Sequence, residues 1–294
     1  MDAFKNRIAI VTGGASGLGR ALCEELSERG ATVIVADINK QAAWEVADAL
    51  KERGGSAEAA ELDVANSDAV NSVVAQIISK YGRLDYIFNN AAIAVVGELR
   101  DTTPEDWRRI VEVNLLGVIY GSMAAYQPML RQGSGHIVNI SSMTGLMATP
   151  MLTHYSTTKW GIVGFSTSLR LEAASLGVKV SVACPSLIRT KIADRTNYLN
   201  IDKERYLALL PWSLMSEPRA VAKSILRGVR RNESIIIYPF YARLAWWCYR
   251  ICPALFTPLF RKTLKDFRKL RLAHGTTFKH HEKGNFNPDE TCRP

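Results

Sequence analysis

The 294-residue chain lacks the features that mark several protein classes. Five cysteines are too few and too scattered for a disulfide scaffold. The sequence contains no stretch of about 18 uncharged apolar residues, so a membrane-spanning helix is not expected. Residues 1–12 lack the apolar core and the cleavage site of a signal peptide. With 22% charged and 47% hydrophobic residues, the chain is not disordered, collagen-like or a coiled coil. We therefore expect a soluble, cytoplasmic protein.

The net charge of +9 is distributed unevenly. Residues 1–218 carry 21 Lys+Arg and 23 Asp+Glu, a balance of −2, whereas residues 219–294 carry 16 and 5, a balance of +11. Because the body of the chain is slightly acidic, nucleic-acid binding by the whole chain has no support. The basic character belongs to the C-terminal part and needs its own explanation.

Short apolar segments alternate with helical segments along most of the chain. The expected strands are residues 7–11, 32–36, 57–62, 84–89, 135–141, 178–183 and 234–238. The expected helices are residues 19–29, 40–53, 68–80, 105–130, 155–175 and 217–231. This alternation predicts an α/β fold, a Rossmann-type doubly wound parallel sheet of about seven strands with helices on both faces. Residues 1–240 would form this catalytic domain, and residues 241–294 a basic, aromatic-rich extension.

A glycine-rich turn, residues 12–19, joins the first expected strand to the first expected helix. Glycine permits a tight turn and a close approach to a pyrophosphate, and the helix N-terminus offers free N–H groups to phosphates. Such a turn alone is weak evidence, but its place at the start of a βαβ unit predicts a dinucleotide site. The candidate contacts are Gly13, Ser16, Gly17, Leu18 and Gly19.

An acidic residue, Asp37, ends the second expected strand. A carboxylate at this position accepts hydrogen bonds from the adenosine ribose hydroxyls and repels a 2′-phosphate. Ser16 leaves the glycine turn without an Arg or Lys that could offset such a phosphate. Both features favour NAD over NADP, although a merely solvated carboxylate at a strand end remains the alternative for Asp37.

Several further motifs follow in a fixed order, and with them the chain resembles the short-chain dehydrogenase/reductase family, in its single-domain branch. The resemblance covers about residues 5–240. Its motifs are Thr12-Gly13-x-x-x-Gly17-x-Gly19, Asp63-Val64, Asn89-Asn90-Ala91, Asn114, Ser142 and Tyr155-x-x-x-Lys159. Ala92 and Ser186 depart from glycines that are frequent in the family, and the last fifty or so residues do not match its core.

The resemblance implies further cofactor contacts. Asp63 and Val64 would contact the adenine, although simple strand-end packing is as good an explanation for Val64 and Ala91. The motif Asn89-Asn90-Ala91 would line the nucleotide groove. The nicotinamide end would be met by Thr190, which follows Pro185 and Ile188.

Tyr155 and Lys159 are four residues apart on an expected helix and therefore share a face. Moving a hydride to or from a carbinol carbon also requires moving a proton to or from its oxygen. A free tyrosine has a pKa near ~10, and an ammonium ~4 Å away at an effective dielectric of ~20 is worth up to ~4 kcal/mol, or roughly three pKa units. Tyr155 is therefore the expected general acid or base, with Lys159 lowering its pKa. Both residues are also expected at the cofactor, where Lys159 would hold the nicotinamide ribose.

Two more polar residues complete the candidate catalytic set. Ser142 follows an expected strand, where a hydroxyl can hydrogen-bond the substrate oxygen. Its neighbour Ser141 is the alternative, and the spacing to Tyr155 in the family favours Ser142. The resemblance implies that Asn114 holds a water in a proton path to Lys159.

The segments expected to wall the pocket, residues 93–96, 143–152 and 186–210, are mostly apolar. They favour an apolar secondary alcohol or ketone, such as a steroid-, terpenoid-, aromatic- or lipid-like compound, unless these side chains are core or subunit contacts. The alternatives are an NADP-dependent carbonyl reductase of oxoacyl type and a dinucleotide-binding regulatory protein without turnover. We expect a homodimer or homotetramer and no metal.

The basic extension has two interpretations. Residues 240–260 are rich in aromatics, and residues 261–271 add six basic residues against Asp266. Aromatic residues beside Lys and Arg suit the surface of an anionic membrane, which residues 240–273 would contact. In the second interpretation, which we favour slightly, the extension forms a cap that packs over the pocket or on a partner subunit and leaves its basic face solvated.

Overall fold

The computed structural model describes residues 2–190 and 192–272. Seven parallel strands form one sheet in the order β3-β2-β1-β4-β6-β7-β9. They are β1 (Ile8–Thr12), β2 (Thr32–Asp37), β3 (Ser56–Glu61), β4 (Tyr86–Asn89), β6 (Gly135–Ile140), β7 (Val178–Pro185) and β9 (Ile235–Tyr238). The strand order reverses between β1 and β4, as in a doubly wound sheet. The predicted fold class is confirmed.

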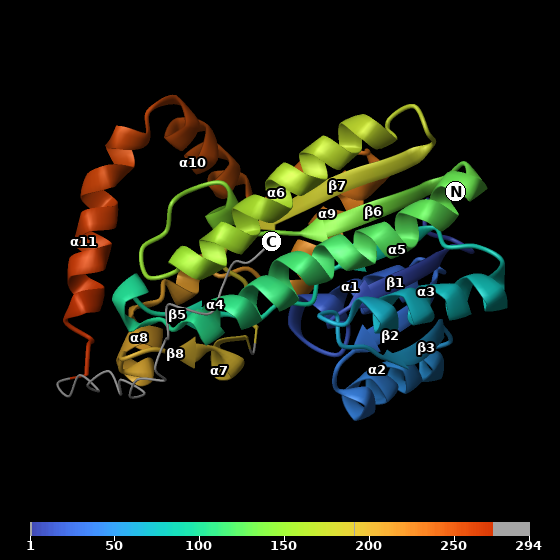
Figure 1. Cartoon of the computed structure of the whole chain (residues 1–294), viewed down its shortest axis with the longest axis horizontal. Coiled ribbons are helices and arrows are strands. Elements are labelled where there is room, and N and C mark those ends of the chain that lie inside the picture. The colour runs from blue at the N-terminus through green and yellow to red at the C-terminus, as the bar shows by residue number, and fades with distance from the viewer. Residues whose placement is uncertain (1, 191, 273–294) are drawn as a thin grey trace, which may run out of the picture.

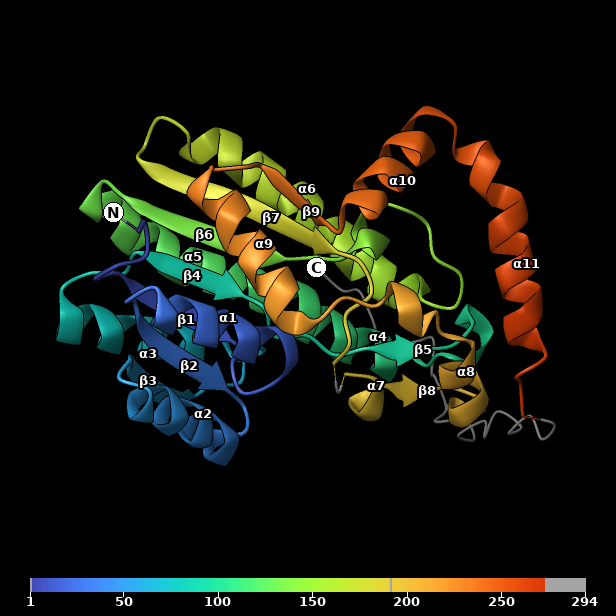
Figure 2. The ribbon, with the colours of Figure 1, turned by 180° about the vertical axis from the view of Figure 1, so that it is seen from behind.

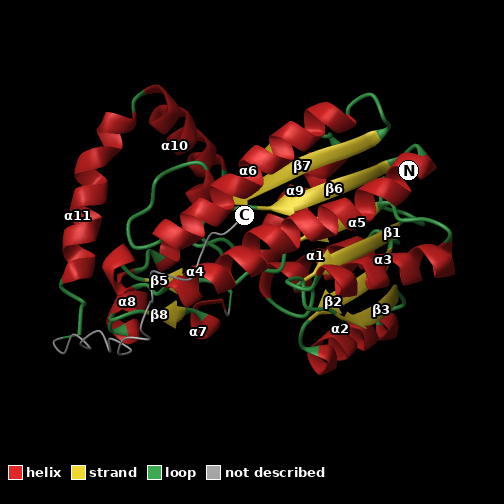
Figure 3. Ribbon diagram, viewed as in Figure 1, coloured by secondary structure: helices red, strands yellow, loops and turns green. Residues whose placement is uncertain are grey.

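Helices cover both faces of the sheet, as Figures 1, 2 and 3 show. One face is covered by α1 (Gly17–Glu28), α2 (Lys40–Glu52) and α9 (Pro218–Arg230), the other by α3 (Ser67–Tyr81), α5 (Gly117–Gln132) and α6 (Thr153–Ala173). Alternate strand residues feed the two layers, since Ala9 and Val11 pack with the first set of helices and Ile8 and Ile10 with the second. This two-sided burial explains the nearly continuous apolar strands in the sequence.

The expected helix over residues 105–130 is in fact three segments. These are α4 (Pro104–Val111), the π-helical segment η2 (Glu112–Leu116) and α5. Thr103 and Asp106 form a capping box that starts α4. The wider π-helical turn contains Asn114, whose side chain is fully buried. Periodicity could not reveal this break, because a single π-turn inserts one residue without changing the helical composition.

Small elements beyond the sheet were not expected from the sequence. They are β5 (Val95–Val96), β8 (Asn197–Tyr198), which pairs with it, α7 (Ile192–Arg195), α8 (Lys203–Leu209) and the short helical turns η1 (Leu99–Asp101), η3 (Met143–Gly145), η4 (Trp212–Leu214) and η5 (Pro253–Phe256). Figure 1 shows β5, β8, α7 and α8 beyond the carboxyl edge of the sheet.

The C-terminal extension forms an arm of two helices, α10 (Phe240–Ile251) and α11 (Thr257–Arg268). Both views show the arm at the end of the molecule opposite α2, with α11 running back toward α8 (Figures 1 and 2). Residues 273–294, the rest of the predicted extension, lie outside the described residues. The arm begins directly after β9, so the last strand of the sheet fixes where it starts.

Candidate active site

The predicted site residues meet at one edge of the sheet. Because all seven strands are parallel, their carboxyl ends share this edge, and Thr12, Asp37, Asn89 and Pro185 each end a strand there. Ser142 follows the end of β6 by two residues. In open α/β sheets the crevice outside the carboxyl ends, where the strand order reverses, is the place where ligands bind.

The glycine turn after β1 is a backbone surface from which side chains are excluded. A Cβ at Gly19 would lie 2.0 Å from the Gly13 carbonyl oxygen, and one at Gly13, where φ is +64°, would lie 2.9 Å from Ala91 Cα. Ser16 is the N-cap of α1 and makes no side-chain capping bond, and the first turn of α1 holds no acidic residue. The N–H groups at the N-terminus of α1 are therefore available to an anion such as a pyrophosphate.

The turn is fastened to β4 by hydrogen bonds that the sequence analysis did not assign. The Thr12 hydroxyl accepts the N–H groups of Asn90 and Ala91 at 3.0 and 3.1 Å. In return Asn90 Nδ2 donates to the Thr12 carbonyl at 2.9 Å. Asn90 and Ala91 thus support the turn, and the only sequence signal for this was the threonine that opens the glycine motif.

Asp37 lies beside the same turn. Its carboxylate is 6% exposed and accepts the N–H groups of Ala15 at 3.1 Å and Asn39 at 3.0 Å. It is therefore a positioned group and not a merely solvated strand end. Asp63 is exposed and its carboxylate accepts the N–H of Ala65 at 3.0 Å.

Two other predicted cofactor contacts have structural partners of their own. Val64 is buried, and its side chain would lie 2.8 Å from a Cβ at Gly117. Leu18 is 8% exposed and packs in the core beneath the sheet. Both side chains pack against the protein, so any contact with a cofactor would come from their backbone or their outer edge.

The segment after β7 reaches the glycine turn. The Thr190 side chain would be 3.3 Å from a Cβ at Gly17, and Ile188 forms a parallel bridge with Ser216 that holds the segment. A side-chain-free cradle, free helix N–H groups and a neighbouring carboxylate together fit a dinucleotide. Thr190, predicted at the nicotinamide end, therefore lies beside the glycine turn.

Tyr155 and Lys159 share one face of α6. Lys159 Nζ is 5.4 Å from the centroid of the Tyr155 ring and donates to the Ile140 carbonyl at 3.0 Å. Lys159 is fully buried, and burial lowers the pKa of its ammonium to about 8. The lysine is thus still mainly protonated at neutral pH.

Burial dominates the acidity of the tyrosine. Burial raises the pKa of Tyr155 to about 12, and a hydrogen bond with the Ser142 side chain opposes this rise. The lowering by Lys159 that the sequence analysis expected is not seen in the protein by itself. A further positive charge at the site would therefore be needed for Tyr155 to act as a base at neutral pH.

The structure separates the two neighbouring serines. Ser142 faces Tyr155, and its hydroxyl also accepts the Thr144 N–H at 3.2 Å. Ser141 is buried, and its hydroxyl donates to the Lys159 carbonyl at 2.9 Å. Only Ser142 is placed to contact a group that reacts with Tyr155.

Asn114 fastens a pocket segment. Its Oδ1 accepts the Ile93 N–H at 2.8 Å, and its Nδ2 donates to the Ile93 carbonyl at 2.9 Å. The π-helical turn brings this buried amide to the loop after β4. The role in a water path to Lys159 stays a prediction.

The arm covers the loop that follows Ser142. Trp246 packs in a cluster with Leu115, Met143 and Met147, and the Tyr249 hydroxyl accepts the Ala148 N–H at 3.4 Å. The sequence left open whether the extension caps its own pocket, and these contacts are made within one chain. The sequence analysis did not single out Trp246, which packs against the same buried cluster as Met143 and Met147.

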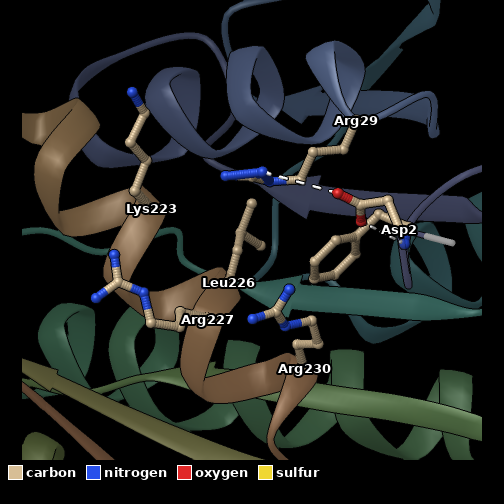
Figure 4. A pocket seen from close by; sticks show the side chains of 7 residues that line it. Asp2, Arg29, Lys223, Leu226, Arg227 and Arg230 are labelled. Carbon is tan, nitrogen blue, oxygen red and sulfur yellow. Dashed lines mark hydrogen bonds and ion pairs between the residues drawn. The ribbon is translucent and has the colours of Figure 1, made fainter.

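A separate basic hollow lies at the opposite edge of the sheet, between the N-terminal segment, α1 and α9 (Figure 4). It is lined by Asp2, Phe4, Arg29, Lys223, Leu226, Arg227 and Arg230. Arg29 is paired with Asp2 at 4.0 Å. None of the predicted catalytic residues lines it.

The chain is similar in sequence to known enzymes. Residues 7–199 match the short chain dehydrogenase family model. A 3-oxoacyl-[acyl-carrier-protein] reductase of Synechocystis sp. is 34% identical over 76% of this chain and 90% of its own. A cyclohexanol dehydrogenase of Acinetobacter sp. is 31% identical over 76% and 88%.

Solved structures share the fold. A short-chain dehydrogenase from Streptomyces avermitilis has a TM-score of 0.75 at 26% identity and covers 89% of this chain and 99% of its own. One from Burkholderia phymatum, solved in complex with NAD, has a TM-score of 0.76 at 24% identity and covers 94% and 99%. Within residues 2–190 and 192–272, no helix is long and apolar enough to cross a membrane, and no three His, Cys, Asp or Glu residues are grouped to hold a metal ion.

Proposed function

Because the chain belongs to the short-chain dehydrogenase family and is an NAD(P)-dependent oxidoreductase acting on CH–OH groups, we propose that it acts with NAD on an apolar secondary alcohol or the corresponding ketone. The observation that carries the proposal is the pairing of Tyr155 with Ser142 at the carboxyl edge of the sheet, under an apolar loop and arm. Steroid-, terpenoid-, aromatic- and lipid-like compounds fit this class.

The chain's own residues supply the proton chemistry. When bound, the dinucleotide supplies a hydride acceptor or donor at its nicotinamide. Tyr155 takes the proton from the substrate hydroxyl during oxidation and returns it to the carbonyl oxygen during reduction. Ser142 donates a hydrogen bond to the same oxygen, and the Lys159 ammonium together with the positive charge of a bound oxidised nicotinamide would stabilise the phenolate of Tyr155.

The substrate class follows from the pocket segments. Residues 93–96 and 143–152 contain no charged residue, and the arm contacts the second segment through the Tyr249 hydroxyl at Ala148. A substrate carboxylate or phosphate would find no cationic partner on these segments, whereas apolar groups gain about 25 cal/mol for each Å² removed from water. An apolar carbon skeleton around the reacting carbon is favoured.

A second candidate is an NADP-dependent carbonyl reductase of oxoacyl type. It is favoured by the sequence similarity to 3-oxoacyl-[acyl-carrier-protein] reductases. Asp37 opposes it, because two unit charges about 4 Å apart at an effective dielectric of about 20 repel by about 4 kcal/mol. The choice between the two rests on this one carboxylate.

Cofactor titration tests the proposal. We expect NADH to quench tryptophan fluorescence at a Kd at least about tenfold lower than NADPH, which corresponds to about 1.4 kcal/mol. Asp37→Asn keeps the acceptor for the Ala15 N–H and removes the charge. It should therefore reduce the difference between the Kd for NADPH and the Kd for NADH. Asp48→Asn, which removes an exposed carboxylate of α2 paired with Lys51, is the matched control. A tighter Kd for NADPH in the unaltered chain would favour the second candidate.

A screen of apolar alcohols tests the substrate class. The full chain is incubated with NAD and each alcohol while NADH absorbance is followed. We expect turnover with cyclic or long-chain secondary alcohols. Turnover confined to oxoacyl thioesters with NADPH would contradict the proposed function.

A further inference from the structure

The outer face of α10 is an unbroken apolar stripe. Phe240, Leu244, Trp247 and Ile251 follow one another at intervals of four, three and four residues, which places them on one side of a helix. Leu255 and Leu259 follow in the next turns of the arm. All six side chains are between 48% and 80% exposed. We refer to these six residues as the outer stripe.

The opposite face of α10 already has its partners. Ala242 is buried, Trp246 packs against the buried cluster that contains Leu146, and the Tyr249 ring contacts Phe256 and Phe260 at 5.6 and 6.2 Å between centroids. The inner face therefore provides the apolar contacts that hold α10 against the rest of the chain. The outer stripe is therefore not required for packing within the chain, and exposed apolar side chains gathered on one face of a helix mark an interaction site.

Cations border the outer stripe. Residues 240–272 contain eight Lys+Arg and one acidic residue, Asp266. Arg243 and Arg250 are exposed on α10, and the Arg250 guanidinium lies 5.6 and 6.0 Å from the ring centroids of Trp246 and Trp247. On α11, Arg261, Lys262 and Lys265 are exposed. Apolar and aromatic side chains flanked by cations are the pattern of helices that lie in the interface of an anionic bilayer.

We propose that the outer stripe docks on an anionic lipid bilayer, with α10 lying along the surface and the basic side chains of the arm contacting lipid headgroups. Charge decides between this occupant and a second copy of the chain. A two-fold contact would place each basic arm against the same basic arm of its partner, which is repulsive. Anionic headgroups instead complement the exposed Arg243, Arg250, Arg261, Lys262 and Lys265.

The proposal also gives the pocket a position. The inner face of α10 contacts the loop after Ser142, so a docked arm would hold this loop close to the lipid. This consequence rests on the proposed function, since it matters only for a lipophilic substrate. Lipid binding itself is measured without substrate or cofactor, so its failure would leave the proposed function untouched.

The test is flotation of the full chain with vesicles of phosphatidylcholine alone or phosphatidylcholine with phosphatidylserine. The variant is Trp247→Glu, and the matched control is Trp44→Glu on α2. Trp247 is 48% and Trp44 49% exposed, and each has a cation over its ring, Arg250 at 6.0 Å and Lys40 at 5.2 Å. Both variants add one negative charge at a solvent-facing tryptophan. Circular dichroism and the Tm check that each variant is folded, and Ile251→Glu serves as a second variant at an 80% exposed position.

We expect the unaltered chain and Trp44→Glu to float with the anionic vesicles and to be released by high salt. Trp247→Glu and Ile251→Glu should each bind at least about tenfold more weakly. Equal binding to neutral vesicles, no binding by the unaltered chain, or unchanged binding by both stripe variants would each overturn the proposal. Loss of a dimer in sedimentation for Ile251→Glu, without vesicle binding by the unaltered chain, would assign the stripe to a second copy instead.

Discussion

The carboxyl edge of the sheet and the C-terminal arm border the same site but are held in different ways. At the edge, Thr12, Asn90, Asp37 and Asn114 all hydrogen-bond to backbone groups. The arm is joined to the rest of the chain mainly through side chains, with a backbone bridge between Ile201 and Arg271 near its end. The edge is therefore fixed by the fold itself. Substitutions in the arm, by contrast, are expected to leave the sheet undisturbed.

Ion pairs hold the far end of the arm. Arg268 binds Glu98 at 2.7 Å and Arg271 binds Asp101 at 2.8 Å. The Arg271–Asp101 pair is partly buried, whereas Arg268 is 54% exposed, and a pair with an exposed member contributes only about 0.2–1 kcal/mol. Under the proposed function, the chemistry belongs to the rigid carboxyl edge and the choice of substrate to the more weakly held arm. The following changes test this difference between the two regions.

The largest effect is expected at the edge. Tyr155→Phe removes the only proposed proton donor, so kcat should fall by about 10²–10⁴-fold, while the Kd for NADH stays within about twofold. Stopped-flow kinetics and a fluorescence titration measure the two quantities. Near-normal turnover by the folded variant would remove the proposed mechanism.

The two serines should separate activity from stability. Ser142→Ala removes a hydrogen bond to the reacting oxygen and should lower kcat about 10²-fold. Ser141→Ala instead loses its bond to the Lys159 carbonyl and should cost about 1 kcal/mol of unfolding free energy with a smaller effect on kcat. Denaturant titration and kinetics on both variants make the comparison. The reverse pattern would assign the catalytic role to Ser141.

Acid should weaken the sheet before it releases the arm. Burial lowers the pKa of His136 to about 3, below its unfolded value near ~6.5. Its neutral form is therefore favoured by folding, and stability is lost as the pH falls below ~6.5, by about 1.4 kcal/mol per pH unit. Urea titrations between these pH values measure the slope, and His136→Gln should flatten it.

The anchor of the arm should persist to lower pH. Burial would raise the pKa of Asp101, but hydrogen bonds from Arg271 and Asn200 outweigh it, so this pKa is lowered. The stabilisation is thus present above the unfolded carboxyl pKa near ~3.9 and is lost as the pH falls below it. Limited proteolysis at each pH measures the release of the arm. Release of the arm already at pH 6 would contradict the expectation that the sheet weakens first.

The inner and outer faces of α10 should affect different quantities. Trp246→Ala loosens the packing of the cluster that also supports Met143 and Met147, and should raise KM for an apolar substrate about tenfold, since about 1.5 kcal/mol of apolar burial is lost. Trp247→Ala, its exposed neighbour, should leave KM unchanged in solution. Equal effects on KM would show that the two faces are not distinct.

The smallest effect is expected at the ion pairs of the arm. Arg268→Ala should change the unfolding free energy by no more than about 1 kcal/mol and increase tryptic cleavage of the arm. Arg231→Ala, which removes an exposed pair with Glu233 away from the arm, is the control. A large loss of stability in Arg268→Ala alone would mean that the arm is part of the cooperative core.

Local sequence patterns were sufficient for the strands of the sheet. Each of the seven expected strands is present within two residues of its predicted bounds, because buried parallel strands are short, apolar and bounded by turn residues. The places of Asp37 and of the glycine turn followed from the same reading. The π-helical turn at Asn114 and the pair β5–β8 were not found, since neither has a periodic signal of its own.

By itself, the sequence determined the order of strands and helices, the glycine turn and the shared face of Tyr155 and Lys159, because these depend on neighbours in the chain. Only the tertiary structure decided that Ser142 and not Ser141 faces Tyr155, that burial sets the pKa of this tyrosine, and that Trp246 points inward while Trp247 points outward. The physical reason is that burial and the direction of a side chain are set by residues distant in sequence, which pack against it only when the sheet and the arm are assembled.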